Sequence, residues 1–503
     1  MIHGFFYADT HFTVAESDGN LFGGFLEHIG RAVYTGIYEP EHPTADSDGF
    51  RRDVAELVRM LDMPLTRYPG GNFVSAFNWK DSIGPKENRP VRLDTVWSAA
   101  EPNHVGLDEF IKWCRLVNSE PIYVVNMGTG TVQSAREVVE YCNHPSGSYW
   151  SDLRRKNGSE EPHKIRYWCL GNEMSSPMQP GYLTAEGYAE KARAAARLMR
   201  AIDPSIKLIA CGSSCRTSPD FGEWDYKVVK ELFWDIDYLA VHIYFRNSNN
   251  NYLEFLAAPE MMDKLITDTA ACCDAVSARH QSHKKIMLAI DEWNVCNHDF
   301  FGNDDPATRW QVARNLWEEK YTLADALAVA GGMMSLIDHS DRVKIACIAQ
   351  TVNVLAPIMT EPGGKIWKQT IFNPLALFSR WGRGTVLKIT GTGPEYSCGN
   401  LTVPYLRCTA VWQKESQMLN LFVLNRSLKE DAEFSFEFSG AVFAGLENAQ
   451  TLHGKDPAET NDSVCERVAM QSLNLNEIHL EKHQITAKLP PFSWSILQIN
   501  LVQ

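Results

Sequence analysis

The feature that most constrains the fold is an alternation of short apolar runs with amphipathic helical segments over about the first 370 residues. In the intervening segments apolar residues recur at i, i+3, i+4 and i+7, as in the stretch from Val54 to Leu61. Parallel strands covered on both faces read as continuous apolar runs and need helical crossovers. Eight runs have the length of such strands: 22–30, 64–71, 121–128, 165–173, 207–214, 238–245, 285–294 and 347–354.

Eight strands, each followed by a helix, predict an α/β fold of the (β/α)8 TIM-barrel type, with a doubly wound open sheet as the alternative. One of the helices is expected over 185–201, ending before Asp203-Pro204.

The pattern changes after about residue 375, where polar and apolar residues alternate with period 2 and Gly, Asn and Pro separate the runs. This predicts an additional C-terminal antiparallel β-sandwich of the jelly-roll kind, and the short N-terminal piece can add a strand to it. We therefore predict a barrel domain over 18–372 and a sandwich domain over 1–17 and 373–503. Its expected strands are 418–425, 432–438, 477–481, 484–489 and 492–500.

The composition argues against several classes of function. The net charge of −14, from 62 acidic and 48 basic residues, disfavours a nucleic-acid partner. No run reaches the roughly 18 apolar residues of a membrane span, and the N-terminus lacks the pattern of a signal peptide. The 12 cysteines form no Cys-x-x-Cys framework and are interpreted as reduced buried thiols. We expect a cytoplasmic protein without a cofactor, in which the sequon at Asn157 has no role.

Polar side chains gather at the predicted carboxyl ends of the barrel strands, where such barrels carry their active sites. Two are carboxylates, at strands four and seven. An ionisable group at the edge of an apolar strand is costly unless it is paired or used. A salt bridge to an arginine, or a cap on the next helix, could explain either one alone. The set is Glu27, Arg67, Asn72, Asn172, Glu173, His242, Tyr244, Glu292 and Gln350.

The pair Glu173 and Glu292 fits glycoside hydrolysis, which needs one carboxylic acid to protonate the leaving oxygen and one carboxylate to attack the anomeric carbon. Retaining enzymes hold the two groups about 5–5.5 Å apart. Because two carboxyls so close repel each other when both are ionised, one can act as the acid while the other stays charged.

The segments around these residues resemble glycoside hydrolase family 51, the α-L-arabinofuranosidases, from about Phe22 to Gln350. RYPGGNF at 67–73 and GNE at 171–173 are the most specific pieces. The others are FGGFLEHIGRAVYTGIYEP from 22, VHIYF from 241 and LAIDEWNV from 288. The resemblance implies a clan A barrel with a β-sandwich built from the C-terminal part and the first residues. It further implies that Glu173 is the acid/base and Glu292 the nucleophile.

The resemblance also implies a set of residues around the bound furanose, whose chemistry suits a sugar site. Asn172 could hydrogen-bond the 2-hydroxyl, and Tyr244 could hold Glu292 ionised. Arg67 could instead only balance barrel carboxylates, and Trp97 could be a loop-packing residue. His242 could be a binding residue or a satisfied core histidine. The complete expected set is Glu27, Arg67, Asn72, Trp97, Asn172, His242, Tyr244 and Gln350.

One departure from the family pattern concerns the side of the leaving group. Many members carry a tryptophan two residues after the Trp-Asn of the nucleophile motif, where this chain has Cys296. Cysteine offers no stacking face, so we expect a more open leaving-group side, where His298 could substitute. His28 and His242 lack a third ligand at recognisable spacing, so we predict no metal site.

The leading hypothesis is a retaining exo-α-L-arabinofuranosidase that removes terminal non-reducing residues from arabinan- or arabinoxylan-derived oligosaccharides. The alternatives are a retaining β-glycosidase or endoglucanase of the same clan, and a non-catalytic carbohydrate-binding barrel. The retention of both carboxylates speaks against the last. The resemblance also implies a homo-oligomer such as a hexamer, while the linkage preference stays open.

Overall fold

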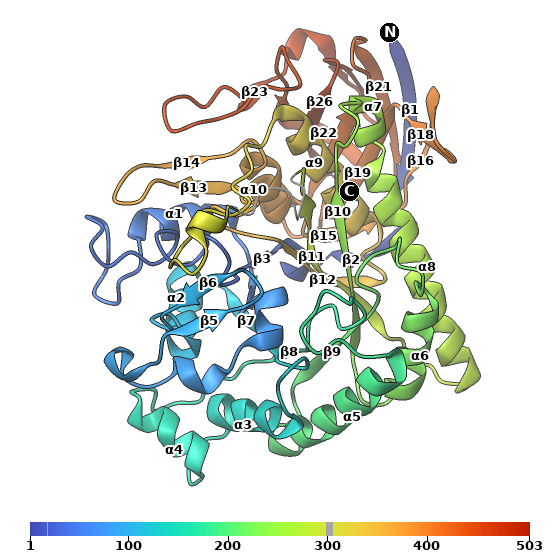
Figure 1. The fold of residues 1–503 in the computed structure, drawn as a ribbon. Helices are drawn as coiled ribbons and strands as arrows, with labels where there is room; N and C mark the ends of the chain where they lie inside the picture. Colours follow the sequence, from blue (N-terminus) through green and yellow to red (C-terminus); the bar gives the residue numbers. More distant parts are fainter. Residues whose placement is uncertain (18, 298–304, 503) are drawn as a thin grey trace.

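A closed barrel of eight parallel strands lies at the centre of the computed structural model, which describes residues 1–17, 19–297 and 305–502 (Figure 1). The strands follow one another around the barrel in chain order, and the last closes it by pairing with the first. This confirms the predicted (β/α)8 barrel over the open sheet. The strands are β3 (Gly23–Phe25), β4 (Leu65–Tyr68), β7 (Glu120–Val125), β8 (Tyr167–Leu170), β9 (Lys207–Cys211), β10 (Tyr238–Phe245), β11 (Met287–Val295) and β12 (Val343–Ile348).

Helices follow the strands and cover the outside of the barrel (Figure 1). The predicted helix at 185–201 is confirmed as α5, which Thr184 caps by accepting from the amide of Gly187 and which ends at Ile202. The helices are α1 (Arg52–Leu61), α2 (Leu107–Val117), α3 (Val132–Asn143), α4 (Tyr149–Lys156), α5 (Ala185–Ile202), α6 (Glu223–Leu232), α7 (Tyr252–Phe255), α8 (Ala258–Arg279), α9 (Leu323–Asp338) and α10 (Phe372–Trp381).

The eighth strand lies earlier in the chain than we predicted. The expected run was 347–354, but β12 is Val343–Ile348. Lys344 interrupts the apolar pattern near the start of the strand, which hid that start in the sequence. The apolar residues Val352 and Val354 continue the run, but they lie in a buried turn after the strand.

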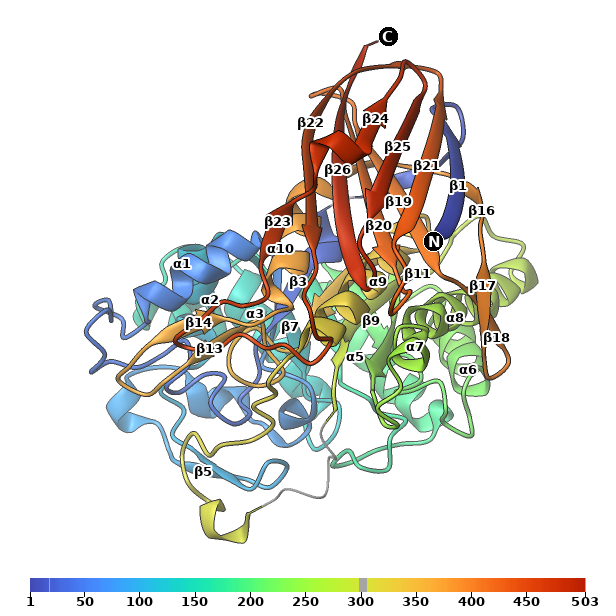
Figure 2. The same ribbon diagram turned by 90° about the horizontal axis from the view of Figure 1, so that it is seen from above.

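Two β-sheets pack face to face beyond the barrel and form the predicted sandwich (Figure 2). The five predicted strands are confirmed within a residue or two at their ends, and β1 and β2 from the N-terminus join them, one in each sheet. β1 runs parallel to β21, whereas the prediction was antiparallel throughout. The five-stranded sheet has the order β16 (Thr390–Thr392), β1 (Ile2–Asp9), β21 (Ala432–Ser439), β25 (Gln484–Leu489), β24 (Ile478–Leu480). The seven-stranded sheet has the order β2 (Thr13–Ser17), β15 (Gly384–Leu387), β19 (Leu406–Gln413), β20 (Met418–Asn425), β26 (Ser493–Val502), β22 (Val442–Leu452), β23 (Met470–Ser472).

Three short hairpins complete the strands. They are β5 (Arg92–Asp94) with β6 (Ala99–Glu101), β13 (Ile358–Thr360) with β14 (Ile366–Lys368), and β17 (Glu395–Cys398) with β18 (Leu401–Pro404). The first lies in the long loop between β4 and α2, and the second follows β12. Both therefore extend from the end of the barrel at which its strands finish.

Helix α9 joins the barrel to the sandwich. Its residues from Leu323 to Ile337 are all buried, because it packs against β11 on one side and against β19, β20 and β26 on the other. Polar contacts reinforce this junction: Arg407 of β19 forms ion pairs with Asp263 of α8 at 2.9 Å and with Asp338 of α9 at 2.8 Å. The division into domains at 17/18 and 372/373 stays a prediction.

The 12 cysteines, all within the described ranges, form no disulfide, and 8 of them are buried, although Cys215 and Cys465 are exposed. Among the described residues, no helix combines the length and the apolar character that crossing a membrane requires.

Candidate active site

A cavity of about 340 Å³ opens at the carboxyl ends of the barrel strands. It contains both carboxylates that the sequence singled out, one from the end of β8 and one from β11. Its walls also include aromatic and apolar side chains, which suits a sugar ring that has polar edges and apolar faces. The lining residues are Glu27, Ile29, Asn72, Trp97, Glu173, Ser176, Ser214, Cys215, His242, Ile243, Tyr244, Glu292, Trp317, Gln350, Val354 and Leu355.

Glu292 is held at the floor of this cavity by two donors. The hydroxyl of Tyr244 donates to one carboxylate oxygen at 2.9 Å, and Arg67 Nη1 donates to the other at 3.3 Å. Burial, aided by the neighbouring Glu173, raises the pKa of Glu292 to about 7, although His242 and Arg67 act to lower it. The two donors bind the ionised form and fix the direction of its oxygens.

An irregularity in β11 brings Asp291 into the site together with its neighbour. Between the pairs Ala240–Ala289 and His242–Glu292, β11 contains one residue more than β10. The register against β12 shifts in the same stretch. Such a bulge breaks the alternation of side chains along a strand. Consecutive residues, Asp291 and Glu292, can therefore contact the same side chains in the barrel.

Asp291 is fully buried and contacts two cations. It lies 2.9 Å from Arg67 Nε and 3.3 Å from His242 Nε2. Although burial raises the pKa of Asp291, Arg67 and His242 outweigh it and lower this pKa to about 2. The same two cations reach the two cavity carboxylates, Arg67 on Glu292 and His242 on Glu173. Asp291 is thus a shared anchor that our sequence analysis missed.

Glu173 follows β8 on a backbone of unusual shape. Gly171 has φ of 91° and Glu173 itself has φ of 46°, in the left-handed region that few side-chain-bearing residues adopt. Its carboxylate contacts His242 Nδ1 at 3.0 Å and Gln179 Nε2 at 3.5 Å. One carboxylate oxygen of Glu173 and one of Glu292 lie within 4.8 Å of each other.

His242 lies between the carboxylates. Burial lowers its pKa, but the charge of Glu292 and the hydrogen bonds with Asp291 and Glu173 outweigh this and raise the pKa to about 10. Glu173, His242 and Glu292 are close enough for a metal ion to bridge them. A protonated imidazole, however, has no lone pair for a metal. The chemistry of this cluster therefore favours an ion-pair network.

A chain of amides connects the two carboxylates along the floor. Arg67 Nη2 donates to Asn172 Oδ1 at 2.8 Å, and Asn172 Nδ2 donates to Asn72 Oδ1 at 3.0 Å. Gln179 then donates to Asn72 and to Glu173. Arg67 and Asn172 are buried beneath the cavity, as braces for the residues that line it. Gln179 is a second residue that the sequence analysis missed.

Glu27 also lines the cavity. It accepts hydrogen bonds from the amide of Phe73 at 2.9 Å, from Trp97 Nε1 at 3.0 Å and from Gln350 Nε2 at 3.0 Å. Burial raises the pKa of Glu27, and the bonds from Phe73 and Trp97 oppose the rise. Its two oxygens border the cavity, where they can accept further bonds from hydroxyl groups.

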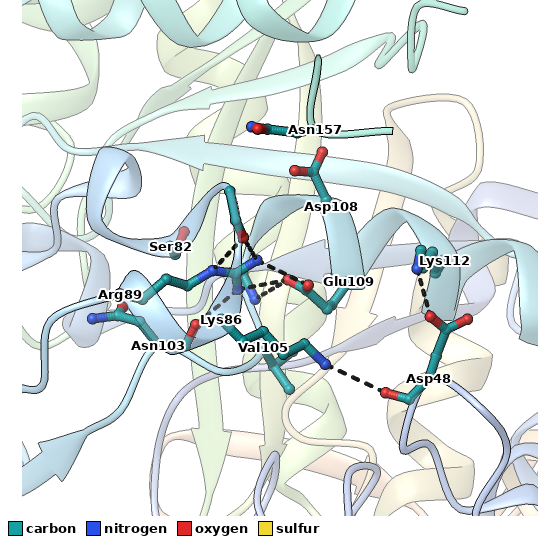
Figure 3. A network of polar contacts seen from close by, with 12 residues as sticks. Asp48, Ser82, Lys86, Arg89, Asn103, Val105, Asp108, Glu109, Lys112 and Asn157 are labelled. Carbon is teal, nitrogen blue, oxygen red and sulfur yellow. Dashed lines mark hydrogen bonds and ion pairs between the residues drawn. The ribbon is translucent and has the colours of Figure 1, made fainter. Parts of the chain in front are cut away.

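The loop that carries Trp97 is fixed by polar contacts at both ends. Asp94 accepts from the amides of Val96 and Trp97 at 2.9 and 3.2 Å, and so shapes the turn before the indole. Farther back, Arg89 donates to the carbonyl of Asn103 at 2.8 Å and pairs with Glu109 of α2 at 2.9 Å (Figure 3). The loop is thereby tied to the barrel wall, and Trp97 occupies a defined place at the cavity.

Trp317 provides a second aromatic side chain at the cavity, edge-on to Trp97 with ring centroids 5.0 Å apart. Cys296, which we expected to leave this side more open, is instead buried among Ile29, Val354 and other apolar residues and does not line the cavity. Trp317 occupies the rim from a loop downstream. His298, the proposed substitute, lies outside the described residues.

Of the ten predicted site residues, eight line the cavity and two, Arg67 and Asn172, lie directly beneath it. His28 is not in the cavity: it is a buried histidine between Glu101, at 2.8 Å, and the hydroxyl of Tyr68, at 2.8 Å.

Known proteins match this chain over nearly its whole length. Two family models match, the α-L-arabinofuranosidase 1 domain at residues 57–264 and the α-L-arabinofuranosidase C-terminal domain at 291–493. A curated arabinofuranosidase of Bacillus subtilis is 44% identical, with 98% of each chain covered. A solved family 51 enzyme from Bifidobacterium longum superposes with a TM-score of 0.94 at 37% identity, covering 99% of both chains. An arabinofuranosidase from Thermotoga maritima, solved with arabinose, gives a TM-score of 0.87 at 31% identity and covers 98% of this chain and 99% of its own. The chain therefore belongs to glycoside hydrolase family 51, the α-L-arabinofuranosidases.

Proposed function

We propose that this protein is a retaining exo-α-L-arabinofuranosidase that removes terminal non-reducing α-L-arabinofuranosyl residues from arabinan- and arabinoxylan-derived oligosaccharides. One observation carries the proposal: oxygens of Glu173 and Glu292 lie within 4.8 Å of each other in a cavity at the ends of the barrel strands. This separation suits a double displacement, because an inverting enzyme keeps its carboxyls about 6.5–9.5 Å apart to admit a water.

The names of the relatives support this substrate class. The Bacillus subtilis relative is named an intracellular exo-α-(1→5)-L-arabinofuranosidase, and a 39% identical relative from Bifidobacterium longum is named an exo-α-(1→6)-L-arabinofuranosidase. We propose α-(1→5)-linked arabino-oligosaccharides as the substrate and the cytoplasm as the location. We also expect a homo-oligomer such as a hexamer, and neither nucleic acid nor membrane as a partner.

In the first step Glu292 is the nucleophile. Tyr244 and Arg67 hold its carboxylate, so it enters the reaction with fixed oxygens, and one oxygen attacks the anomeric carbon. Protonated Glu173 gives its proton to the glycosidic oxygen as the bond to that oxygen breaks. The products are a β-linked arabinofuranosyl-enzyme and the released alcohol.

In the second step Glu173 is the base. It takes a proton from a water whose oxygen attacks the anomeric carbon, and the bond to Glu292 breaks. Two inversions restore the α configuration, and both carboxyls return to their starting protonation. His242, which contacts Glu173 at 3.0 Å, stays protonated and orients the carboxyl through both steps.

The remaining cavity residues bind the furanose. From directly beneath the cavity, Asn172 is expected to donate its second amide hydrogen to the 2-hydroxyl, a contact that strengthens as the anomeric centre becomes positive. Glu27, which also lines the cavity, accepts from the other hydroxyls, and Gln350 beside it donates to them. The indoles of Trp97 and Trp317 restrict the mouth, which favours the entry of a single terminal sugar.

The direct test is hydrolysis of an aryl α-L-arabinofuranoside beside aryl β-glucosides and β-xylosides, with the product followed by NMR. We expect turnover of the arabinofuranoside only, and α-L-arabinofuranose as the first product. Activity confined to a β-pyranoside would refute the substrate, and a β product would refute the double displacement.

A further inference from the structure

A second and larger cavity, of about 440 Å³, adjoins the catalytic cavity. The side chain that joins them is Trp317, which lines both. The size falls within the range of about 300–1,000 Å³ that is usual for ligand sites. Its lining residues are Asn315, Leu316, Trp317, Glu318, Glu319, Lys320, Met359, Trp367, Gln369, Thr460, Asn461 and Asp462.

Three separate segments form its walls, and backbone contacts fix them relative to one another. The loop between β22 and β23 is tied to the start of α9, where the amide of Leu323 donates to Glu459 at 2.9 Å and that of Ala324 to Pro457 at 3.0 Å. On the hairpin side, Trp367 of β14 pairs with Met359 of β13. The cavity is therefore built from both the barrel and the sandwich.

The carboxylates of the walls are already engaged, whereas Lys320 is exposed. Glu318 pairs with Arg31 at 2.6 Å, and Asp462 with Arg467 at 2.7 Å. A cationic ligand would have to displace one of these pairs, and for an anionic ligand the walls offer Lys320 alone. Two indoles and the side chain of Asn315 remain as contact groups, because the amides of Gln369 and Asn461 are already bonded to the backbone. Partly exposed tryptophans suit the apolar faces of a neutral polyhydroxyl ligand.

We propose that this cavity binds the sugars on the leaving-group side of the cleaved bond, with Trp367 as their stacking face. The inference rests on the proposed function and extends it. A terminal arabinofuranosyl residue fills the catalytic cavity, and the rest of a neutral arabino-oligosaccharide passes Trp317 into the second cavity. The enzyme would then favour oligosaccharides over disaccharides although it removes one sugar at a time.

The experiment compares α-(1→5)-arabino-oligosaccharides of two to six sugars with an aryl α-L-arabinofuranoside. For the wild type we expect kcat/KM to rise with length and then level off. In Trp367→Ala, KM for the longer substrates should rise by about fivefold with kcat unchanged, which corresponds to the loss of one aromatic contact. The aryl substrate, which cannot reach Trp367, should be unaffected.

The matched control is Trp234→Ala, because Trp234 is 62% exposed and lies just before β10, at the opposite end of the barrel. This substitution should leave kcat/KM unchanged for both the aryl substrate and the long oligosaccharides. Asn315→Trp, at an exposed lining position, fills the cavity without removing a packed side chain. It should cause the same length-specific rise in KM, and it therefore tests the subsite even if Trp367→Ala does not fold.

Equal effects on the aryl and the long substrates, or no effect of length in the wild type, would overturn the subsite and leave the proposed function standing. Failure of the wild type to hydrolyse the aryl arabinofuranoside would instead overturn the proposed function. The two failures are therefore distinguishable.

Discussion

The surroundings of Glu292 and of Glu173 differ, although the two carboxylates share one cavity. Glu292 lies within a strand, and its side chain is 11% exposed and bound by Tyr244 and Arg67. Glu173 lies beyond its strand, on a left-handed backbone, and its side chain is 18% exposed. Its described partners are His242 and Gln179, the latter at 3.5 Å.

This difference matches two kinds of chemical work. A nucleophile gains from a rigid, ionised carboxylate aimed at one carbon, so strong donors on both oxygens help it. An acid that later acts as a base must hold and release a proton, and it must face the leaving group and then water. The lighter binding and greater exposure of Glu173 suit that second task.

The largest expected effect comes from the more tightly held carboxylate. Glu292→Ala should lower kcat about 10⁴-fold or more for every substrate, because no covalent intermediate can form. Azide should then give the β-arabinofuranosyl azide through a single inversion, which NMR can identify. Glu41→Ala, at an exposed site, is the control and should keep the wild-type kcat. A loss of kcat below tenfold in Glu292→Ala would show that Glu292 is not the nucleophile.

Glu173→Ala should have an effect that depends on the leaving group. We expect about a 10³-fold loss for oligosaccharides, which need a proton on the departing oxygen, and a much smaller loss in the first step for dinitrophenyl glycosides. Azide should restore turnover and give the α-arabinofuranosyl azide, after two inversions. An equal loss for all leaving groups would show that the two carboxylates do not divide the work as proposed.

Asp291→Asn tests the anchor that the two surroundings share. Without the negative charge, Arg67 and His242 lose the partner that directs them to Glu292 and Glu173. We expect kcat to fall about 100-fold with little change in KM, since small misplacements of reacting groups have effects of this size. Thermal unfolding measured in parallel distinguishes this fall in kcat from a loss of the fold. A change in KM alone would contradict the role of Asp291 in positioning Arg67 and His242.

The smallest effect is on pH dependence. His242 lowers the pKa of Glu292, so His242→Gln should raise that pKa and move the acid limb of kcat/KM upward by about one pH unit. The sign follows because the reaction needs ionised Glu292, which is lost as pH falls through its pKa. Activity should thus fall on the acid side first. If the acid limb does not move, His242 does not influence the ionisation of Glu292.

The barrel and most of the site could be predicted because each strand end carries a local signal. The apolar runs locate the strands, and the polar residues that follow them mark one end of the barrel. The start of β12 was missed because Lys344 breaks its apolar run. The strand β22 was missed because polar residues such as Glu447 and Asn448 follow one another in it.

The missed site residues depend on geometry that no local pattern carries. Strict alternation along LAIDEWN assigns Asp291 and Glu292 to opposite faces, and only the bulge in β11 brings them together. Gln179 and Trp317 lie on loops, where no periodicity indicates which way a side chain points. Only the DEWN motif contained a signal for Asp291. A second acid next to a strand-end glutamate indicates that a cationic partner lies nearby.

The pairing of the two N-terminal strands has a consequence for folding during synthesis. β1 pairs with β21 and β2 with β15. Both strands therefore stay without these partners until the whole barrel has been synthesised. Until then their edges are open to pairing with other chains. Once the sandwich closes, the first residues and the last are held in one body, and the start of the chain leads directly into β3. The pairing of β1 and β2 thus requires the C-terminal part of the chain, and incomplete chains leave the edges of these two strands exposed to aggregation.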